Sequence, residues 1–150
     1  MDAVQVLMYD HRKLEELFQE VEVLDQRSMV RKAELTIMIS DELAEHTALE
    51  ETYFFPALAH EAGEDSCVAE VNEEHHIIQI VLLELAGMTP LDSTFHPKLK
   101  VLIDLVRSHF RHEEDQLLPA AQQILSSQRL NELGAQMLAR RENDADVRHV

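Results

Sequence analysis

The stretch His46-Thr47-Ala48-Leu49-Glu50-Glu51, followed by Pro56-Ala57, recurs as His109-Phe110-Arg111-His112-Glu113-Glu114, followed by Pro119-Ala120, at an offset of 63 residues. A second pair of fragments, Asp10-His11 with Leu14 and Glu74-His75 with Ile78, repeats at an offset of 64 residues. Each half of the chain therefore carries one histidine followed by a His-x-x-x-Glu motif. Because similar fragments at a fixed spacing indicate repeated structural units, the chain is predicted to contain two similar halves.

The apolar residues around these motifs follow a helical period. In the first segment they recur at intervals of three, four and seven, at Val4, Leu7, Leu14, Phe18 and Val21. Such spacing places them on one face of a helix. With breaks at Asp25–Ser28, Ala62–Ser66 and Gly87–Pro97, the pattern predicts four long helices, over residues 3–25, 29–61, 66–87 and 97–125. A short fifth helix is expected around Leu130, Leu133, Met137 and Leu138.

The fold class predicted from these elements is all-α. Two helical hairpins, each with one copy of the repeat, are expected to pack as an up-down-up-down four-helix bundle with pseudo-twofold symmetry, followed by the short C-terminal helix. The predicted domain covers residues 1–141, and residues 142–150 are expected to form a polar C-terminal tail that frays.

Composition narrows the classes of function. The chain has 150 residues, 29 of them acidic and 13 basic, so its net charge is −16. An acidic surface does not attract phosphate backbones or anionic lipids, so no nucleic acid and no membrane partner is expected. The single cysteine, Cys67, excludes an intrachain disulfide and suits a reducing compartment. No signal peptide or transmembrane segment is recognisable, and the protein is predicted to be cytoplasmic.

Four histidines occupy positions of the apolar stripes, one on each long helix, and two of them have a glutamate one turn later. They are His11, His46 with Glu50, His75, and His109 with Glu113. Burying these groups without partners costs several kcal/mol per unpaired charge. A single buried histidine is usually hydrogen-bonded, and one His-x-x-x-Glu pair is common on helix surfaces. Four helices that each offer a ligand favour a metal centre, of iron or manganese rather than zinc.

These motifs resemble the hemerythrin-like (HHE cation-binding) family, and the match extends from His11 to Pro119. The resemblance implies a four-helix bundle that holds a non-haem di-iron centre, in a family that binds oxygen, nitric oxide or peroxide, or senses iron and oxygen. Carried over to this chain, it implies that His11 and His46 bind one iron and that His75 and His109 bind the other. Glu50 and Glu113 would bridge the two iron ions, together with an oxo or hydroxo group.

One position departs from the oxygen-carrying hemerythrins, which place a second histidine four residues after the first on the third helix. Here that residue is Gln79, a poor ligand, and His76 points about 100° away from His75. Tyr53 lies on the inward face and is a candidate replacement ligand; alternatively it is a core tyrosine whose hydroxyl makes a hydrogen bond. With Tyr53 bound, about one coordination position remains for a small ligand.

The other polar residues near the motifs receive weaker roles. Glu51 and Glu114 are interpreted as surface charges, although either can compete with its neighbour as the bridge. Asp10 and Glu74 are expected to be solvated. The remaining histidines are interpreted as superficial, with His112 at the edge of the site: His60, His76, His96, His112 and His149.

The predicted function is reaction with a small-molecule oxidant, most simply the catalase-like decomposition of hydrogen peroxide. An oxygen-rich ligand set with an open position favours redox turnover over oxygen storage. Two alternatives remain. One is a module that binds or senses O2, NO or iron without turnover, and the other is a metal-free acidic bundle that binds a partner. The sequence makes no prediction of the oligomeric state.

Overall fold

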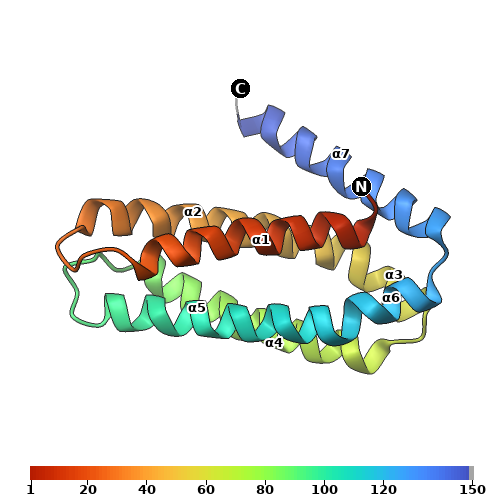
Figure 1. The fold of residues 1–150 in the computed structure, drawn as a ribbon, viewed down its shortest axis with the longest axis horizontal. Helices are drawn as coiled ribbons and strands as arrows, with labels where there is room; N and C mark the ends of the chain where they lie inside the picture. Colours follow the sequence, from red (N-terminus) through yellow and green to blue (C-terminus); the bar gives the residue numbers. More distant parts are fainter. Residues whose placement is uncertain (149–150) are drawn as a thin grey trace.

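Two helical hairpins pack against each other in the computed structural model, which describes residues 1–148 (Figure 1). The first hairpin consists of α1 and α2, with α2 extended by η1 and α3; the second consists of α4 and α5, with α5 extended by η2 and α6. A further helix, α7, follows. The bounds are α1 (Ala3–Glu22), α2 (Met29–Leu49), η1 (Glu50–Phe54), α3 (Phe55–Glu61), α4 (Asp65–Ala86), α5 (Phe95–His112), η2 (Glu113–Leu117), α6 (Leu118–Ile124) and α7 (Ser127–Arg148).

The predicted fold class is confirmed. Residues 1–148 contain no strand, and the four long rods cover residues 3–22, 29–61, 65–86 and 95–124, close to the predicted ranges. The predicted fifth helix is present, but it is longer than expected and includes the segment expected to fray. Helix α7 continues through residues 142–148, whose side chains are mostly exposed. Residues 149–150, which include His149, lie outside the described part of the chain.

Both His-x-x-x-Glu motifs run directly into a π-helical turn. The backbone N–H of Phe55 donates to the carbonyl of Glu50, and that of Leu118 donates to the carbonyl of Glu113. Proline follows each turn, at Pro56 and Pro119. A proline cannot donate to the carbonyl four residues earlier and its ring clashes with that carbonyl, so a wider turn accommodates it. The repeated prolines thus explain why the helix changes its winding immediately after each buried glutamate.

A polar layer separates two hydrophobic clusters along the bundle. On α1, Leu7 belongs to the cluster nearest α3, α6 and α7, and Leu14 belongs to the cluster nearest the opposite loops. His11 lies between them and is buried. The other three long helices place His46, His75 and His109 at the same level. The apolar clusters therefore surround the histidine layer on both sides and exclude water from it.

Helix α7 packs mainly along α1 and crosses beside its N-terminus (Figure 1). The contact is close at Gly134, where an added Cβ would lie 2.7 Å from the backbone carbon of Asp2. A capping box between Asp2 and Gln5 fixes this end of α1.

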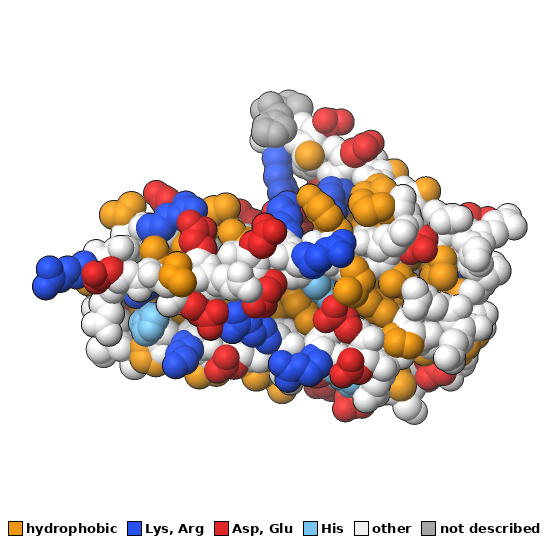
Figure 2. Space-filling view, in the orientation of Figure 1, with side chains coloured by type: hydrophobic (Ala, Val, Ile, Leu, Met, Phe, Trp, Pro, Cys, Tyr) orange, Lys and Arg blue, Asp and Glu red, His pale blue; other side chains and the backbone are white. Residues whose placement is uncertain are grey.

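The surface carries charges of both signs. Acidic and basic side chains are interspersed over the face formed by α1 and α5 (Figure 2). Among them, Arg107 forms ion pairs with Glu15 and Glu22. None of the helices in residues 1–148 combines the length and apolar character that a membrane crossing requires.

Candidate metal centre

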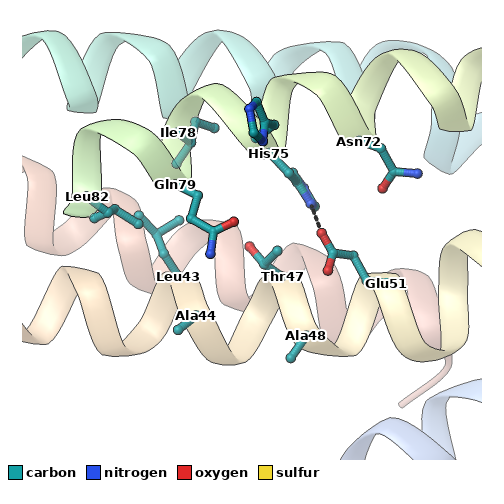
Figure 3. A pocket seen from close by; sticks show the side chains of 11 residues that line it. Leu43, Ala44, Thr47, Ala48, Glu51, Asn72, His75, Ile78, Gln79 and Leu82 are labelled. Carbon is teal, nitrogen blue, oxygen red and sulfur yellow. Dashed lines mark hydrogen bonds and ion pairs between the residues drawn. The ribbon is translucent and has the colours of Figure 1, made fainter. Parts of the chain in front are cut away.

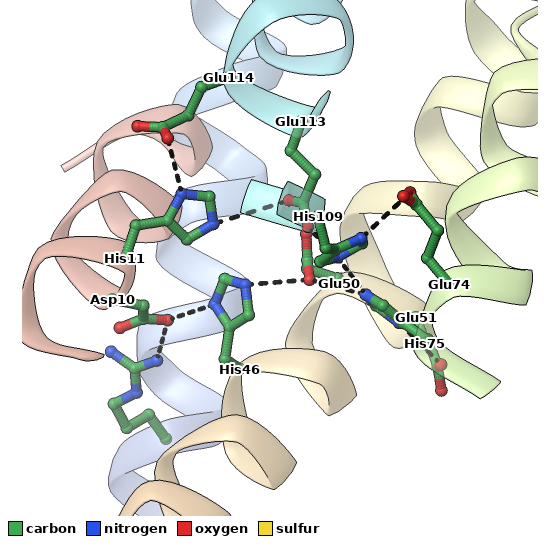
Figure 4. A network of polar contacts seen from close by, with 11 residues as sticks. Asp10, His11, His46, Glu50, Glu51, Glu74, His75, His109, Glu113 and Glu114 are labelled. Atoms are coloured by element: carbon green, nitrogen blue, oxygen red, sulfur yellow. Dashed lines mark hydrogen bonds and ion pairs between the residues drawn. The ribbon is translucent and has the colours of Figure 1, made fainter. Parts of the chain in front are cut away.

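Six buried side chains converge in the middle of the bundle (Figure 4). Their potential ligand atoms form two groups, each with all atoms within 4.8 Å of one another. One group contains His11, His46 and Glu113, and the other contains Glu50, His75, His109 and Glu113. Glu50 and Glu113 have no exposed surface, and the four histidines are at most 6% exposed.

Each glutamate faces one histidine from each pair. The Glu50 Oε1 atom lies 3.0 Å from His46 Nε2 and 3.4 Å from His75 Nε2. Glu113 also faces both pairs, but with a different oxygen for each. Its Oε2 atom lies 3.7 Å from His11 Nε2, and its Oε1 atom contacts His109 Nε2. A carboxylate between two pairs of imidazoles has the placement that a bridging ligand requires.

The spacing of the histidine nitrogens also fits a metal ion. The Nε2 atoms of His75 and His109 lie 2.9 Å apart. Two imidazole nitrogens that bind one ion at about 2.1 Å and at right angles lie about 3 Å apart. The observed pair matches this separation.

Several polar atoms of this cluster have no hydrogen-bond partner. Within residues 1–148, the buried side-chain nitrogen and oxygen atoms without a partner belong to only four residues, His11, His46, Glu50 and Glu113. They include both oxygens of each glutamate and the Nε2 atoms of His11 and His46. Leaving such groups unsatisfied costs about 1–3 kcal/mol each, and more when the group is charged. The residues therefore fit a bound cation, which supplies the missing interactions.

An outer ring of carboxylates orients the histidine rings from behind. The Nδ1 atom of His46 donates to Asp10 over 3.0 Å, and that of His75 donates to Glu51 over 3.1 Å. His109 Nδ1 donates to Glu74 over 3.2 Å. Such bonds fix the ring so that Nε2 points at the metal position, and they raise the basicity of the ligand nitrogen.

The fourth carboxylate is farther away and completes the repeat. Glu114 Oε2 lies 3.8 Å from His11 Nδ1, beyond hydrogen-bond distance. Asp10 and Glu74 come from corresponding positions of the two halves, as do Glu51 and Glu114. The ring of carboxylates therefore follows the same pseudo-twofold symmetry as the histidines.

The expectation that Asp10 and Glu74 are solvated is wrong. Asp10 is 3% exposed, and the Glu74 side chain is 30% exposed and bonded to His109. His112 also donates to Glu74, over 2.8 Å, so it belongs to this network. The signal was present in the repeat, because each of the two acids precedes a repeated histidine. However, the histidine that each acid contacts lies on a neighbouring helix, so the pattern of a single helix does not reveal the contact.

Arg141 is a further residue of the network that the sequence did not indicate. It belongs to α7, outside the repeat, and its Nη2 atom donates to Asp10 Oδ2 over 2.7 Å. Its Nε atom donates to Glu45 over 3.1 Å.

Charge pairing shifts several pKa values of the metal-free cluster. Burial of His109 opposes its protonation, but the adjacent carboxylate of Glu113 outweighs this and raises its pKa to about 9. Burial likewise opposes the charge of His46, yet Glu50 and Asp10 hold its pKa well above the ordinary value. For Glu50, burial favours the neutral acid, but the charge of His46 holds the pKa well below the ordinary value. Without metal, a protonated His46 therefore neutralises the ionised Glu50.

The remaining candidate residues are placed as follows. Tyr53 is half-buried and packs against the apolar cluster nearest α3, α6 and α7. Glu114 is 36% exposed, so the geometry favours Glu113 as the bridge. Gln79 and His76 are exposed and line a groove between α2 and α4.

This groove reaches the candidate centre from one side (Figure 3). It has a volume of about 460 Å³, and His75, Glu51, Thr47 and Gln79 line it. The corresponding groove between α1 and α5, of about 490 Å³, is lined by His11 and three arginines, Arg12, Arg107 and Arg111. There Phe110, the counterpart of Thr47, stacks on the His11 ring with centroids 3.8 Å apart. The His75 ring has its own aromatic neighbour, Phe55, but at a centroid distance of 5.3 Å, so it is less closely covered than His11.

Comparisons with known proteins agree with this architecture. A hemerythrin HHE cation binding domain-containing protein from Mycobacterium kansasii has a similar crystal structure, with a TM-score of 0.83 and 23% identity over 95% of this chain and 86% of that one. A protein named DNA nickase from Nostoc sp. (strain PCC 7120 / SAG 25.82 / UTEX 2576) is 25% identical over 139 residues, or 93% of this chain. The chain spans only 39% of that relative's length.

The family comparison covers the whole repeat. The Hemerythrin HHE cation binding domain family matches residues 2–121, which include both His-x-x-x-Glu motifs and the six converging side chains. On this match, the chain belongs to the hemerythrin HHE cation binding domain family.

Proposed function

We propose that the buried cluster binds two iron ions and that the loaded protein decomposes hydrogen peroxide. The main support for the metal site is the set of buried side-chain atoms that have no hydrogen-bond partner. In a hydrophobic bundle, both oxygens of two fully buried glutamates lack any hydrogen bond, and they face imidazole nitrogens. A pair of divalent cations satisfies these groups together, because imidazole and carboxylate are both good ligands for iron.

The proposed roles of the histidines follow the two groups of atoms, which share Glu113. His11 and His46 hold one ion, and His75 and His109 hold the other. Glu50 and Glu113 bridge them, since each faces one histidine of both pairs. Tyr53, which packs against the apolar cluster beside this layer, remains a proposed further ligand.

Two iron ions, when bound, supply the redox chemistry of peroxide decomposition. Two molecules of hydrogen peroxide yield two of water and one of O2, so no external electron donor is needed. Gln79 supports turnover over reversible oxygen carriage. Because it replaces a histidine, the metal position at His75 and His109 has only two nitrogen ligands, and its other ligands are oxygen atoms. The bundle excludes bulk water, and the outer carboxylates keep the histidine rings fixed.

The groove between α2 and α4 is the proposed route for the small oxidant. Thr47 is small where the opposite half has Phe110, so a small neutral molecule can approach His75 from this side. Glu51 lines the same groove and is 51% exposed. Its carboxylate can accept a proton from incoming peroxide while remaining bonded to His75.

A nucleic acid substrate, which the name of the Nostoc relative suggests for that protein, is not part of this proposal. The net charge of −16 opposes binding to a phosphate backbone.

Two neighbouring histidines provide the test. His75→Ala removes a proposed ligand, and His76→Ala removes an exposed side chain from the next position of the same helix. O2 evolution from peroxide is measured for the wild-type and both variants after anaerobic loading with ferrous iron. Activity in the wild-type and His76→Ala, and its loss in His75→Ala, supports the proposal. Bound iron without O2 evolution in the wild-type rejects the catalase-like activity and favours a module that binds or senses O2, NO or iron.

A further inference from the structure

Arg141 connects the C-terminal helix to one half of the candidate metal centre. Its Nη2 atom donates to Asp10 Oδ2 over 2.7 Å, and the same oxygen accepts the Nδ1–H of His46 over 3.0 Å. Asp10 is 3% exposed and the Arg141 side chain 23% exposed. A continuous set of hydrogen bonds thus runs from α7 through a buried carboxylate to a proposed ligand.

Within residues 1–148, the other half of the centre has no equivalent of this arginine. There Glu74 takes the place of Asp10, and its second donor is His112, which comes from the same helix as the ligand His109. Arg141 lies beyond residue 121, where the family match ends. The pseudo-twofold symmetry that relates the ligands is therefore broken in the outer network, and α7 breaks it.

The physical consequence follows from the fixed charge of arginine. The guanidinium stays charged at all ordinary pH values and binds carboxylates in a defined geometry. Its hydrogen bond holds the buried Asp10 carboxylate in place. An immobile Asp10 in turn keeps the Nδ1–H of His46 directed away from the centre and leaves Nε2 free to bind metal.

We propose that Arg141 is a positioning residue for the His11/His46 metal position, which makes the two metal positions unequal. This inference rests on the proposed metal centre and goes beyond it, because it assigns a role in metal affinity to a helix outside the family match. The His75/His109 position does not depend on α7. Loss of Arg141 weakens only one of the two binding events.

Arg140 provides the matched control. It is the adjacent arginine of α7, its side chain is 40% exposed, and it pairs with Asp144 on its own helix. Arg140→Gln changes the net charge and the helix as Arg141→Gln does, but leaves Asp10 untouched. A difference between the two variants therefore reports the buried contact and not the general charge of α7.

The experiment titrates metal-free protein anaerobically with ferrous iron and resolves the two binding events by calorimetry. In Arg141→Gln, one event is expected to weaken by about 10- to 100-fold, the usual effect of losing a partner behind a ligand. The other event, and both events in Arg140→Gln, stay as in the wild-type. In a His75→Ala background, the remaining binding event belongs to the His11/His46 position, and Arg141→Gln is expected to weaken it. In a His46→Ala background, the remaining event belongs to the His75/His109 position, and Arg141→Gln is expected to leave it unchanged.

Folding is checked separately by circular dichroism, and Arg141→Lys provides a second variant that retains the charge. If Arg141→Gln does not fold, Arg141→Lys is tested in its place, and a smaller loss of iron affinity is expected at the His11/His46 position. Equal weakening of both events, or no weakening in a folded variant, overturns the inference while leaving the proposed metal centre intact. A wild-type protein that binds no iron rejects both.

Discussion

Replacing Gly134 by alanine tests how α7 is docked on the bundle. The added Cβ would lie 2.7 Å from the backbone carbon of Asp2 and 2.9 Å from the backbone nitrogen of Ala3, and closer still to the carbonyl oxygen of Met1. Non-bonded carbon atoms normally pack at about 3.5–4.0 Å. Either α7 or the first turn of α1 must therefore move by about 1 Å. All three atoms belong to the backbone, so no side-chain rotation relieves the clash.

Two effects oppose each other in this variant. In an exposed helix, alanine in place of glycine stabilises by about 1 kcal/mol. Overpacking costs about 1–3 kcal/mol, and we expect the upper part of this range because the capping box holds Asp2 in place. The net loss is then about 1–2 kcal/mol, which lowers Tm by about 2–8 °C in a protein of this size.

Gly87→Ala is the control for this substitution. Gly87 ends α4, and the nearest atom to its added Cβ is the Glu84 carbonyl oxygen at 3.6 Å, an ordinary contact. Its effect is expected to stay within about 0.5 kcal/mol. Thermal and urea unfolding of metal-free protein, followed by far-UV circular dichroism, measures both variants. A Gly134→Ala protein as stable as the wild-type, or more stable, refutes the close docking of α7.

Three further predictions concern the centre, the groove and the core. In the metal-free protein His109 is protonated up to about pH 9, whereas metal binding requires the neutral ring. Iron binding is therefore expected to release at least one proton at pH 7, since the pKa of His46 is raised as well, and to weaken at least tenfold per pH unit below 9; calorimetry in buffers of different ionisation enthalpy measures this, and pH-independent binding contradicts it. Thr47→Phe narrows the α2/α4 groove and is expected to slow azide binding to the iron-loaded protein by about tenfold, a barrier of about 1.4 kcal/mol, whereas Arg111→Phe in the opposite groove leaves the stopped-flow rate unchanged. Phe54→Ala removes a side chain with no exposed surface and is expected to lower the free energy of unfolding by about 3–5 kcal/mol in urea denaturation; a loss below about 1 kcal/mol contradicts the described packing.

The repeat predicted the bundle and the convergence of the six proposed ligand residues because both depend on local spacing. A step of four residues places His46 and Glu50 on one helix face, and a second copy of the motif brings His109 and Glu113 to the same layer. The bundle then has one arrangement in which all apolar stripes are buried. Burial of the four histidines follows from that arrangement.

The outer network could not be predicted in this way. Asp10 and Glu74 lie about 100° around the helix from the adjacent ligand histidines, so the pattern of one helix assigns them to the polar side. Asp10 is buried and Glu74 is partly buried because each meets a histidine from the neighbouring helix. Arg141 is farther still from the motifs, and only the docking of α7 brings it to Asp10. Contacts between helices determine these roles, and the spacing of apolar residues along one helix does not indicate such contacts.

The length of α7 was missed for a related reason. Residues 142–148 are polar and bury little surface, which suggested a frayed tail. The segment nevertheless contains Arg, Glu and Ala, which favour helix, and it continues a helix already anchored at Gly134 and Arg141. Extending an existing helix is easier than starting one, so the polar segment remains helical without a core of its own.

The most direct test of the central claim is the metal content of the purified chain after anaerobic loading with ferrous iron and removal of free metal. The account predicts about two iron ions per chain for the wild-type and for His76→Ala, and a lower content for His75→Ala and Glu113→Ala. It also predicts that a chelator lowers the wild-type Tm, since bound metal stabilises the fold. A wild-type chain that retains no iron, and whose Tm is the same with and without chelator, contradicts the account.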